Sequence, residues 1–367
     1  MKLSTSRESL LQPLQAVIGV VERRQTMPIL ANILLVADGN TLSITATDLE
    51  VELVASSTID NVEVAGEITL PGRKLLEICR ALPEAATIKL SLKGDRVTIQ
   101  SGRSKFVLST LPAAEFPVVE NIDADRELTV RQSDLGKLLE KTHFSMAQQD
   151  VRYYLNGLLL ETGEQRLRAV ATDGHRLALC DIPLDGADGT KSQVIVPRKG
   201  VLELQKLLGD GDNEVQIALG SNHIRLTVGN IRFTSKLIDG RFPDYDRVIP
   251  DVGNNTVSAD RDSFRHALQR AAILSNEKYR GVRLEFNENS VKIQANNPDQ
   301  EEAEDEVEVE YTGDQMEIGF NVNYLLDALA AVEVENVEVG LVDASSSCVV
   351  KAPEDDNCLY VVMPMRL

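Results

Sequence analysis

Residues 31–55 read ANILLVADGNTLSITATDLEVELVA, and residues 153–180 read YYLNGLLLETGEQRLRAVATDGHRLALC. Both stretches are rich in branched apolar residues and turn at a short polar segment, a pattern that predicts paired strands. The dipeptide Thr-Asp occurs at residues 47–48 and again 125 residues later, at residues 172–173. This constant spacing indicates an internal duplication.

A third copy of the pattern follows near the C-terminus. Residues 280–309 read RGVRLEFNENSVKIQANNPDQEEAEDEVEV, and Asn296-Asn297 occupies the place of the Thr-Asp dipeptide. Apolar residues recurring at helical spacing predict an amphipathic helix before each strand pair. The three predicted helices are SRESLLQPLQAVIGVVERR from Ser6, RQSDLGKLLEKTHFSMAQ from Arg131 and DRDSFRHALQRAAILSNEK from Asp260. Candidate N-cap residues at their starts are Ser6, Ser133 and Asp260.

A second helix and a closing set of alternating strands complete each copy. The second helices lie in ITLPGRKLLEICRALP, VIVPRKGVLELQKLLGD and IGFNVNYLLDALAAVE, each introduced by a strand. Polar, turn-rich connectors near residues 121–125 and 251–255 separate the copies. We therefore predict an α+β fold of three tandem helix-strands-helix-strands domains, at residues 1–124, 125–251 and 252–367.

The composition is that of a globular protein with several cores. The chain has 367 residues, of which 43% are hydrophobic and 26% charged, and its length favours two or three domains. It has no unbroken apolar run of the roughly 20 residues that a membrane span needs. Arg7 and Glu8 interrupt the apolar core that a secretory signal would require. We expect a cytoplasmic, unprocessed protein.

The cysteines predict neither a metal site nor a disulfide framework. Cys79, Cys180, Cys348 and Cys358 are widely spread and include no CxxC pair. We expect them to be buried small hydrophobic residues, and we expect no metal ion or cofactor.

The distribution of charge matters for nucleic-acid binding. A formal net charge of -19 argues against tight general binding to phosphates. Five of the six predicted helices nevertheless carry a small net positive charge, and the exception is the segment 321–332 with Asp327. Lys and Arg are also common on ordinary solvated helix faces. The duplication favours a nucleic-acid-binding role for these charges, because equivalent helices of several copies would form one weakly basic surface.

Several strings taken from all three copies, in order, carry a specific resemblance. They are TDLEVE, SGRSKF, LPAAEFP, QQDVRYYLNG, ATDGHRLA, VPRKGV, DGRFPDY, AAILSNEKYRGVRL and YVVMPMRL. Across its whole length the chain resembles the bacterial sliding clamp, the beta subunit of DNA polymerase III. The resemblance implies a homodimeric ring of six similar domains, with helices lining a central hole, sheets on the outside and duplex DNA passing through without sequence preference.

The resemblance also implies which side chains touch DNA. A ring held on DNA by topology needs only weak, water-screened phosphate contacts, and these leave it free to slide. The candidates are Arg24, Arg73, Gln149, Tyr153, Tyr154, Arg198 and Lys199. The alternative for these residues is ordinary surface charge, with core packing for the two tyrosines.

A second implied feature is a groove that receives short peptide motifs of the replicative polymerase, clamp loader, translesion polymerases and repair factors. Leu, Val and Met side chains make an adaptable apolar pocket. The implied lining residues are Leu155, Thr172, Gly174, His175, Arg176, Leu177, Pro243, Arg247, Val248, Tyr279, Asn321, Tyr324, Ser347, Val362, Met363, Pro364, Met365, Arg366 and Leu367. Tyr279 departs from the Phe that the family pattern has at the groove edge.

The resemblance places a head-to-tail dimer interface between the first and third domains. Phe106 and Leu108 lie in a predicted alternating strand, and Ile273 and Leu274 end a predicted helix. Arg103 and Lys105 flank that strand and are candidates to meet Glu301, Glu302 and Glu304 of the acidic run. An alternative interpretation of the acidic run is a solvated strand edge that its charge protects from aggregation.

The strongest competing function is a hydrolase built on Asp173 and His175, which share a strand face. The sequence contains no nucleophile elbow and no phosphate-binding glycine loop, and its four histidines lack metal-ligand spacing. We therefore predict a non-catalytic protein. The remaining alternative is an interaction scaffold that does not encircle DNA, and the basic helix faces argue against it.

Overall fold

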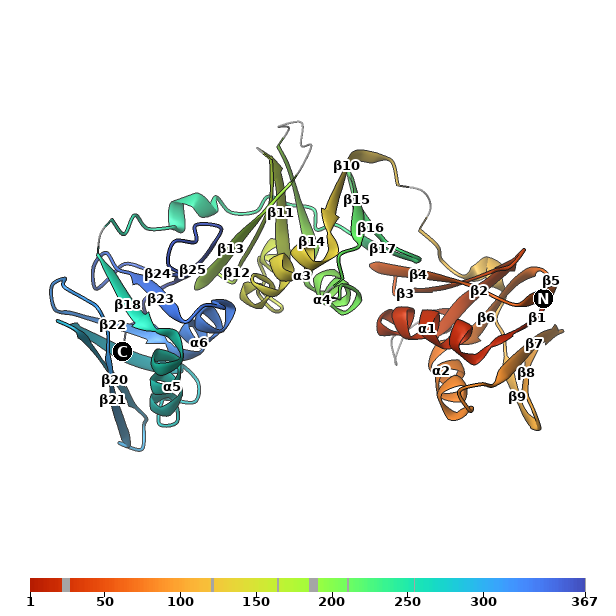
Figure 1. Cartoon of the computed structure of the whole chain (residues 1–367), viewed down its shortest axis with the longest axis horizontal. Helices are drawn as coiled ribbons and strands as arrows, with labels where there is room; N and C mark the ends of the chain where they lie inside the picture. The colour runs from red at the N-terminus through yellow and green to blue at the C-terminus, as the bar shows by residue number, and fades with distance from the viewer. Residues whose placement is uncertain are drawn as a thin grey trace. The chain divides into compact units, whose positions relative to one another are not determined.

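The computed structural model of the chain describes residues 1–21, 27–119, 122–163, 165–184, 191–209, 211–253 and 255–366. Two compact units are present (Figure 1). Unit 1 comprises Met1–Gly136 and Lys199–Leu237, and unit 2 comprises Lys137–Arg198 and Ile238–Leu367. Every strand pairing among the described residues is antiparallel, as expected where hairpins rather than crossovers connect strands.

Unit 1 contains two sheets, of order β5-β1-β7-β8-β9 and β10-β15-β16-β17-β4-β3-β2-β6. Its elements from the first part of the chain are β1 (Lys2–Ser6), α1 (Arg7–Val17), β2 (Asn32–Asp38), β3 (Thr41–Thr47), β4 (Val51–Thr58), β5 (Asn61–Val64), β6 (Gly66–Pro71), α2 (Gly72–Ala81), β7 (Thr87–Lys93), β8 (Arg96–Ser101) and β9 (Ser104–Ser109). Its later elements are β10 (Ala124–Arg131), the start of α3 (Gln132–Glu140), α4 (Arg198–Leu207), β15 (Glu214–Gly220), β16 (His223–Val228) and β17 (Ile231–Lys236).

Unit 2 contains an eight-stranded sheet, β14-β11-β12-β13-β25-β24-β23-β18, and a four-stranded sheet, β21-β20-β19-β22. Its elements from the middle of the chain are η4 (His143–Ser145), η5 (Tyr153–Leu155), β11 (Gly157–Gly163), β12 (Arg166–Thr172), β13 (Arg176–Pro183), β14 (Ser192–Pro197) and η6 (Tyr245–Val248). Its last elements are β18 (Thr256–Asp260), α5 (Arg261–Ala272), β19 (Gly281–Asn287), β20 (Ser290–Asn296), β21 (Glu302–Glu308), β22 (Met316–Asn321), α6 (Val322–Ala331), β23 (Asn336–Gly340), β24 (Cys348–Lys351) and β25 (Cys358–Val362).

The two eight-stranded sheets confirm the duplication. From one edge, unit 1 has β10, β15, β16, β17, β4, β3, β2 and β6, and unit 2 has β18, β23, β24, β25, β13, β12, β11 and β14. Each position holds the corresponding strand of the next copy. Each sheet also joins strands from two copies, through the β17–β4 pairing in unit 1 and the β13–β25 pairing in unit 2. The predicted strand pairs are in fact three-stranded, because the sequence after each Thr-Asp or Asn-Asn turn forms a further strand.

The helices form where the amphipathic pattern predicts them, and they are shorter than predicted. Figure 1 shows α1 beside α2 and α5 beside α6, and both pairs are in contact. Helix α5 buries Phe264, Ala267, Leu268 and Ala271, a stripe at helical spacing that packs on its unit. Burial of the Phe and Leu side chains contributes roughly 1.5–3 kcal/mol each.

Two of the three predicted N-caps are confirmed. The Ser6 hydroxyl accepts from the Ser9 amide at 3.1 Å, and the Asp260 carboxylate accepts from the Ser263 amide at 2.7 Å. The Ser133 prediction was wrong, since α3 begins at Gln132 and Ser133 lies inside the helix. In the described ranges no helix is both long and apolar enough to span a membrane.

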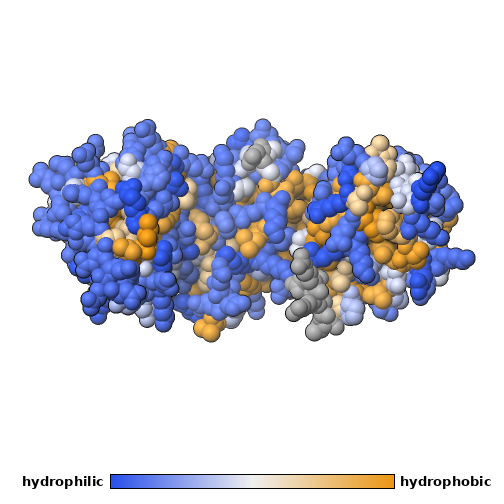
Figure 2. Space-filling model, turned by 90° about the horizontal axis from the view of Figure 1, so that it is seen from below, coloured by the Kyte–Doolittle hydropathy of each residue, from blue (hydrophilic) through white to orange (hydrophobic). Residues whose placement is uncertain are grey.

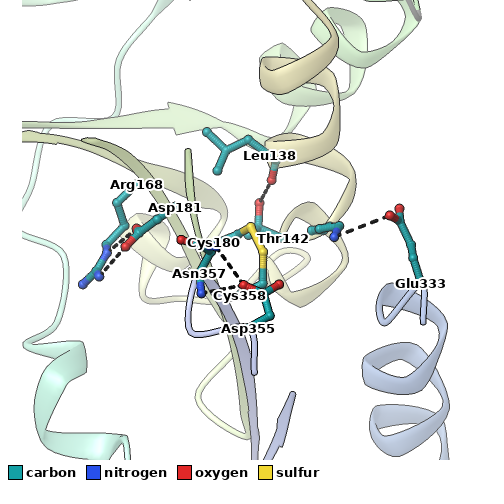
Figure 3. Close-up of a disulfide and its surroundings, with 10 residues drawn as sticks. Leu138, Thr142, Arg168, Cys180, Asp181, Glu333, Asp355, Asn357 and Cys358 are labelled. Carbon is teal, nitrogen blue, oxygen red and sulfur yellow. Dashed lines mark hydrogen bonds and ion pairs between the residues drawn. A yellow bond between two sulfur atoms is a disulfide. The ribbon is translucent and has the colours of Figure 1, made fainter. Parts of the chain in front are cut away.

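The cysteines include one pair that the sequence interpretation missed. Cys180 on β13 and Cys358 on β25 form a disulfide, with Cα atoms 4.1 Å apart and 178 residues of separation (Figure 3). They are direct cross-strand partners. The expectation of no disulfide was therefore wrong, because the pairing arises only when the third copy of the duplication joins the sheet of the second. All four cysteines are buried, as predicted.

Candidate functional site

The turn between β12 and β13 is the most highly organised part of the predicted peptide groove. The Thr172 hydroxyl donates to the Arg176 carbonyl at 2.6 Å, and Asp173 Oδ1 accepts from the amides of His175 at 2.9 Å and Arg176 at 3.1 Å. Gly174 has φ 87°, and a Cβ there would lie 2.9 Å from Arg152 Nη2. Glycine therefore avoids the conformational cost of a positive φ at this position.

Arg176 is the central charged residue of this region. Its guanidinium donates to Asp173 Oδ2 at 3.2 Å, to Asp327 Oδ2 at 2.5 Å and to the Phe144 carbonyl at 2.8 Å. The guanidinium carbon also lies 4.6 Å from the ring centroid of Tyr324. The Arg176 side chain is only 13% exposed, and its contacts link β13 to α6.

The C-terminal strand lies directly beside Arg176. Val362 is the register partner of Arg176 and is 1% exposed. Beyond the strand, the Met363 amide donates to the His175 carbonyl at 2.9 Å, and the Met365 amide donates to the Gly319 carbonyl at 2.8 Å. The tail is thus hydrogen-bonded to the turn between β12 and β13 and to β22, and Met363 is 45% exposed.

An apolar core supports these residues from below. Leu177 packs in a cluster with Phe242, Tyr245 and Val361, and Tyr154 packs against the same cluster. Leu155 is also buried, at 1% exposed. Pro243, Arg247 and Val248, which follow Phe242 in the chain, are exposed at the surface, and Ser347 is half-buried. The region therefore combines a firm apolar base with an exposed rim.

Asn321 and Tyr279 lie beside this region. The Asn321 amide group donates to the Tyr279 carbonyl at 3.2 Å and caps α6 by accepting from the Asn323 amide at 2.9 Å. The Tyr279 side chain is 56% exposed, and the Lys278 amine lies 5.1 Å from its ring centroid. Burial raises the pKa of the Tyr324 phenol, so that hydroxyl remains a neutral hydrogen-bonding group.

We call this set of residues the peptide surface. It comprises Leu155, Thr172, Gly174, His175, Arg176, Leu177, Pro243, Arg247, Val248, Tyr279, Asn321, Tyr324, Ser347, Val362, Met363, Pro364, Met365 and Arg366. All lie in unit 2, and Leu367, which was also predicted, lies outside the described residues. Exposed apolar side chains beside buried ones and a few fixed polar groups are the chemistry that binds a short apolar peptide.

Phe144, Asp327 and the Asp150–Arg152 pair also belong to the surroundings of the peptide surface, and sequence reasoning missed these roles. From the sequence, Asp327 is only a negative charge on a predicted helix. Arg152 donates to both carboxylate oxygens of Asp150, at 3.0 and 2.9 Å, and these bonds lower the pKa of Asp150 to about 2. Figure 2 shows apolar patches enclosed by hydrophilic side chains on the face that it presents.

Of the residues predicted to contact DNA, three are clearly exposed. Arg73 projects from α2, and its guanidinium also donates to the Val21 carbonyl at 2.6 Å. Gln149 has φ 57°, and Tyr153 is 58% exposed. These side chains are accessible to a ligand in solution.

Three further members of the predicted DNA set, Lys199, Arg198 and Tyr154, contact other parts of the protein. Lys199 forms an ion pair with Asp48. Arg198 donates to the Met146 carbonyl at 3.3 Å, and burial lowers the pKa of its guanidinium. Tyr154 packs on the core of unit 2, which was the alternative given for the tyrosines. Arg24 lies outside the described residues.

Comparisons with known proteins match the whole chain. The models for the N-terminal, central and C-terminal domains of the DNA polymerase III beta subunit match residues 1–120, 129–244 and 246–366. The chain belongs to this family. It is 54% identical to the beta sliding clamp of Pseudomonas aeruginosa and 53% identical to that of Escherichia coli K12, over 100% of each chain.

Solved structures agree with this assignment to the beta-subunit family. A crystal structure of the DNA polymerase III subunit beta from Pseudomonas aeruginosa has a TM-score of 0.98 to this chain at 53% identity, covering 100% of both chains. A sliding clamp from the same organism bound to griselimycin has a TM-score of 0.97 at 54% identity, and Caulobacter crescentus pol III beta has 0.95 at 42%, each with full coverage of both chains. The resemblance drawn from the sequence is confirmed.

Two free sheet edges are relevant to assembly in a sliding clamp. Strand β9, with Phe106 and Leu108 half-buried, is an edge of the five-stranded sheet of unit 1. Strand β21, which contains Glu302 and Glu304 of the acidic run, is an edge of the four-stranded sheet of unit 2. Ile273 caps α5 and is 76% exposed, and Leu274 is half-buried. An exposed isoleucine of this extent suits a protein contact.

The turn of the peptide surface recurs in unit 1 of this clamp-family chain. The Thr47 hydroxyl donates to the Val51 carbonyl at 3.0 Å, and Asp48 Oδ1 accepts from the amides of Glu50 at 2.9 Å and Val51 at 2.7 Å. Leu49, at φ 79°, occupies the place of Gly174. The two turns therefore share one hydrogen-bond pattern.

The base beneath the turn differs between the two units. Glu52 stands where unit 2 has Leu177, is 1% exposed and accepts from the Val119 amide at 2.7 Å. Burial raises the pKa of this carboxyl. Lys236, whose amide donates to the Glu50 carbonyl at 2.8 Å, stands where unit 2 has Met363. Unit 1 thus repeats the turn with charged residues in place of the apolar residues Leu177 and Met363 of unit 2.

Proposed function

We propose that this chain is a DNA sliding clamp. Two copies form a ring around duplex DNA, tether the replicative polymerase for processive synthesis and recruit the clamp loader, translesion polymerases and repair factors through short peptide motifs. The single observation that carries this function is the 54% identity to a beta sliding clamp over the full length of both proteins.

The proposed peptide site is the peptide surface of unit 2. Its support is the buried base of Leu155, Leu177 and Val362, together with the exposed Val248 and Met363 side chains at the rim. Displacement of water from such apolar surface stabilises a bound peptide by roughly 25 cal/mol per Å². Fixed polar groups at Arg176 and Asn321 supply direction to the contact.

The proposed contacts to DNA are weak. Arg73, Gln149 and Tyr153 are exposed, and Arg73, Arg198 and Lys199 each have a protein partner and reach phosphates only through the donors that remain. Few and partly engaged cations give low affinity with little sequence preference, which suits a protein that slides.

The proposed dimer joins the β9 edge of one subunit to the β21 edge of the other. Phe106 and Leu108 face Ile273 and Leu274 in this arrangement, and it covers two edges that would otherwise invite unspecific pairing. We retain domain boundaries at residues 1–124, 125–251 and 252–367, which place three similar domains in each subunit and six in the ring.

We further propose that the protein acts in the cytoplasm, without catalytic activity and without a cofactor. Asp173 and His175, the best candidates for a catalytic pair, have structural roles: Asp173 accepts from the His175 amide and from Arg176. A carboxylate engaged in this way serves the turn and not proton transfer to a substrate.

Deletion of residues 363–367 tests the peptide site. We expect it to abolish binding of a labelled polymerase tail peptide, measured by fluorescence polarisation, while sedimentation still shows the dimer. Unchanged peptide affinity would refute the assignment. The matched control is Lys236→Ala at the equivalent position of unit 1, which should leave peptide affinity unchanged.

A further inference from the structure

The disulfide between β13 and β25 lies on the two strands that lead into the peptide surface. Cys180 is 3% exposed and Cys358 is 8% exposed, and the backbone continues the pairing beside them, with the Asp181 amide donating to the Asn357 carbonyl at 2.9 Å. Figure 3 shows the bridge between the two strands, close to the turn that carries Asp355 and Asn357. Cys358 opens β25 directly after this exposed turn.

The other two cysteines lack a partner in the part of the chain that the structure describes. Cys79 on α2 and Cys348 on β24 are free and buried. Burial raises the pKa of each thiol to about 12, so both are protonated at neutral pH. Cys180 and Cys358 stand directly opposite each other on paired strands, and within the described residues the intramolecular disulfide forms between these two.

The disulfide is connected to the peptide surface because both of its strands continue into that surface. Strand β13 begins with Arg176 and Leu177, and β25 ends with Val362 and continues into Met363. The bridged pair is four register positions from the Arg176–Val362 pair. A covalent link at one end of a five-residue strand limits the motion of its other end, where the peptide surface lies.

We propose that Cys180 and Cys358 are an oxidative modification site, and that their conversion between dithiol and disulfide sets the affinity of the peptide surface. This inference rests on the proposed peptide-binding function. In a reducing compartment such a bridge forms transiently in response to an oxidant instead of persisting as a structural staple.

The oxidant is a peroxide. The thiolate of one cysteine attacks a peroxide oxygen of hydrogen peroxide and breaks the O–O bond, which gives a sulfenic acid and, after protonation, water. The second cysteine then attacks the sulfenic sulfur, and the S–S bond forms as a second water leaves. Two thiols and one hydrogen peroxide thus give one disulfide and two waters, with two electrons passing from sulfur to oxygen. A thiol reductant reverses the change by thiol–disulfide exchange.

The disulfide form holds β25 against β13 before a peptide arrives. In the dithiol form the strand has no covalent link to β13 and is held by its backbone pairing with β13 and β24 and by its buried side chains, so its end beside Met363 keeps more freedom that peptide binding must restrict. Preorganisation removes that cost. We expect the oxidised protein to bind about fivefold more tightly, at the low end of known coupling between sites.

The experiment compares the full-length dimer in two states. One sample is reduced with dithiothreitol and the other is oxidised with hydrogen peroxide, then desalted, and peptide mapping by mass spectrometry measures the Cys180–Cys358 link. Fluorescence polarisation gives the dissociation constant of a polymerase tail peptide for each. The control variants are Cys180→Ser/Cys358→Ser, which should bind equally after both treatments, and Cys79→Ala, which should retain the full redox difference.

The results separate the inference from the proposed function. Tighter binding by the oxidised wild type, absent from the double variant, supports the inference. Equal affinity in two states that differ in the mapped link overturns it, and so does failure of peroxide to form the link. If neither state binds the peptide, the peptide surface itself is refuted and the inference falls with it. Circular dichroism of each sample confirms that the fold is intact.

Discussion

Replacement of Arg176 with alanine removes the charged centre of the peptide surface. The change deletes donors to Asp173, Asp327 and the Phe144 carbonyl and leaves that carbonyl without its partner. Loss of one partner from a buried ion pair costs about 3–5 kcal/mol. Asp327 is 46% exposed and regains water, so we take the lower end and expect about 3 kcal/mol less stability for unit 2.

The same change should weaken peptide binding. Arg176 holds the turn against α6, and without its side chain both sides of the peptide surface relax. We expect the dissociation constant of a polymerase tail peptide to rise at least about tenfold, which is 1.4 kcal/mol. Urea unfolding measures the stability, and fluorescence polarisation measures the affinity.

A matched variant separates affinity from stability. Arg168 is also 13% exposed and donates to both oxygens of Asp181, at 2.6 and 2.7 Å; it touches Tyr245 below the peptide surface but is not one of the residues of that surface. Arg168→Ala should therefore lose comparable stability and keep its peptide affinity. Equal affinity losses in the two variants would show that Arg176 acts only through general stability, and unchanged affinity in Arg176→Ala would refute its role.

Three further predictions concern assembly, pH and backbone strain. Ile273→Ala with Leu274→Ala should give monomers by sedimentation velocity, and a persistent dimer would place the interface elsewhere. Asp150 has a pKa lowered from 3.8 to about 2 by Arg152, so its stabilising contribution is complete above pH 3.8 and is lost as the pH falls through about 2. Urea unfolding of Asp150→Asn should differ from the wild type at pH 6 and converge with it toward pH 2, and a constant difference would contradict the pairing. Gly174→Ala should cost about 1–2 kcal/mol in urea unfolding because of its positive φ, and a neutral result would show that the turn adapts.

Much of the architecture follows from local sequence pattern. Repeated alternation and amphipathic spacing predicted the order of helices and strands in three copies, and Ser6 and Asp260 marked two helix starts correctly. Ser133 misled because capping preference is a local rule, whereas Arg131 and Gln132 already continue β10 into the helix. The sequence pattern predicts two strands after the first helix of each copy, whereas the structure has three. The turn after the second strand resembles the end of the strand pair, so the pattern does not reveal the third strand.

The sequence pattern does not predict contacts between residues that are far apart in the chain. Cys180 and Cys358 are 178 residues apart and meet only because β25 adds to the sheet beside β13. In the sequence, Asp327 is only a negative charge on one of the predicted helices. Its role as the partner of Arg176 depends on the same packing of the third copy against the second. The resemblance to the family identified the residues of the peptide surface. Only the register of β13 and β25 shows how these residues are held together.

The central claim is that two copies of this chain form a closed ring around DNA. The most direct test is retention of the labelled protein on circular plasmid after loading, measured by gel filtration before and after one restriction cut. We expect the protein to stay on the closed circle and to run off the linear product, whatever the sequence at the ends. Equal loss from circular and linear DNA would contradict encirclement.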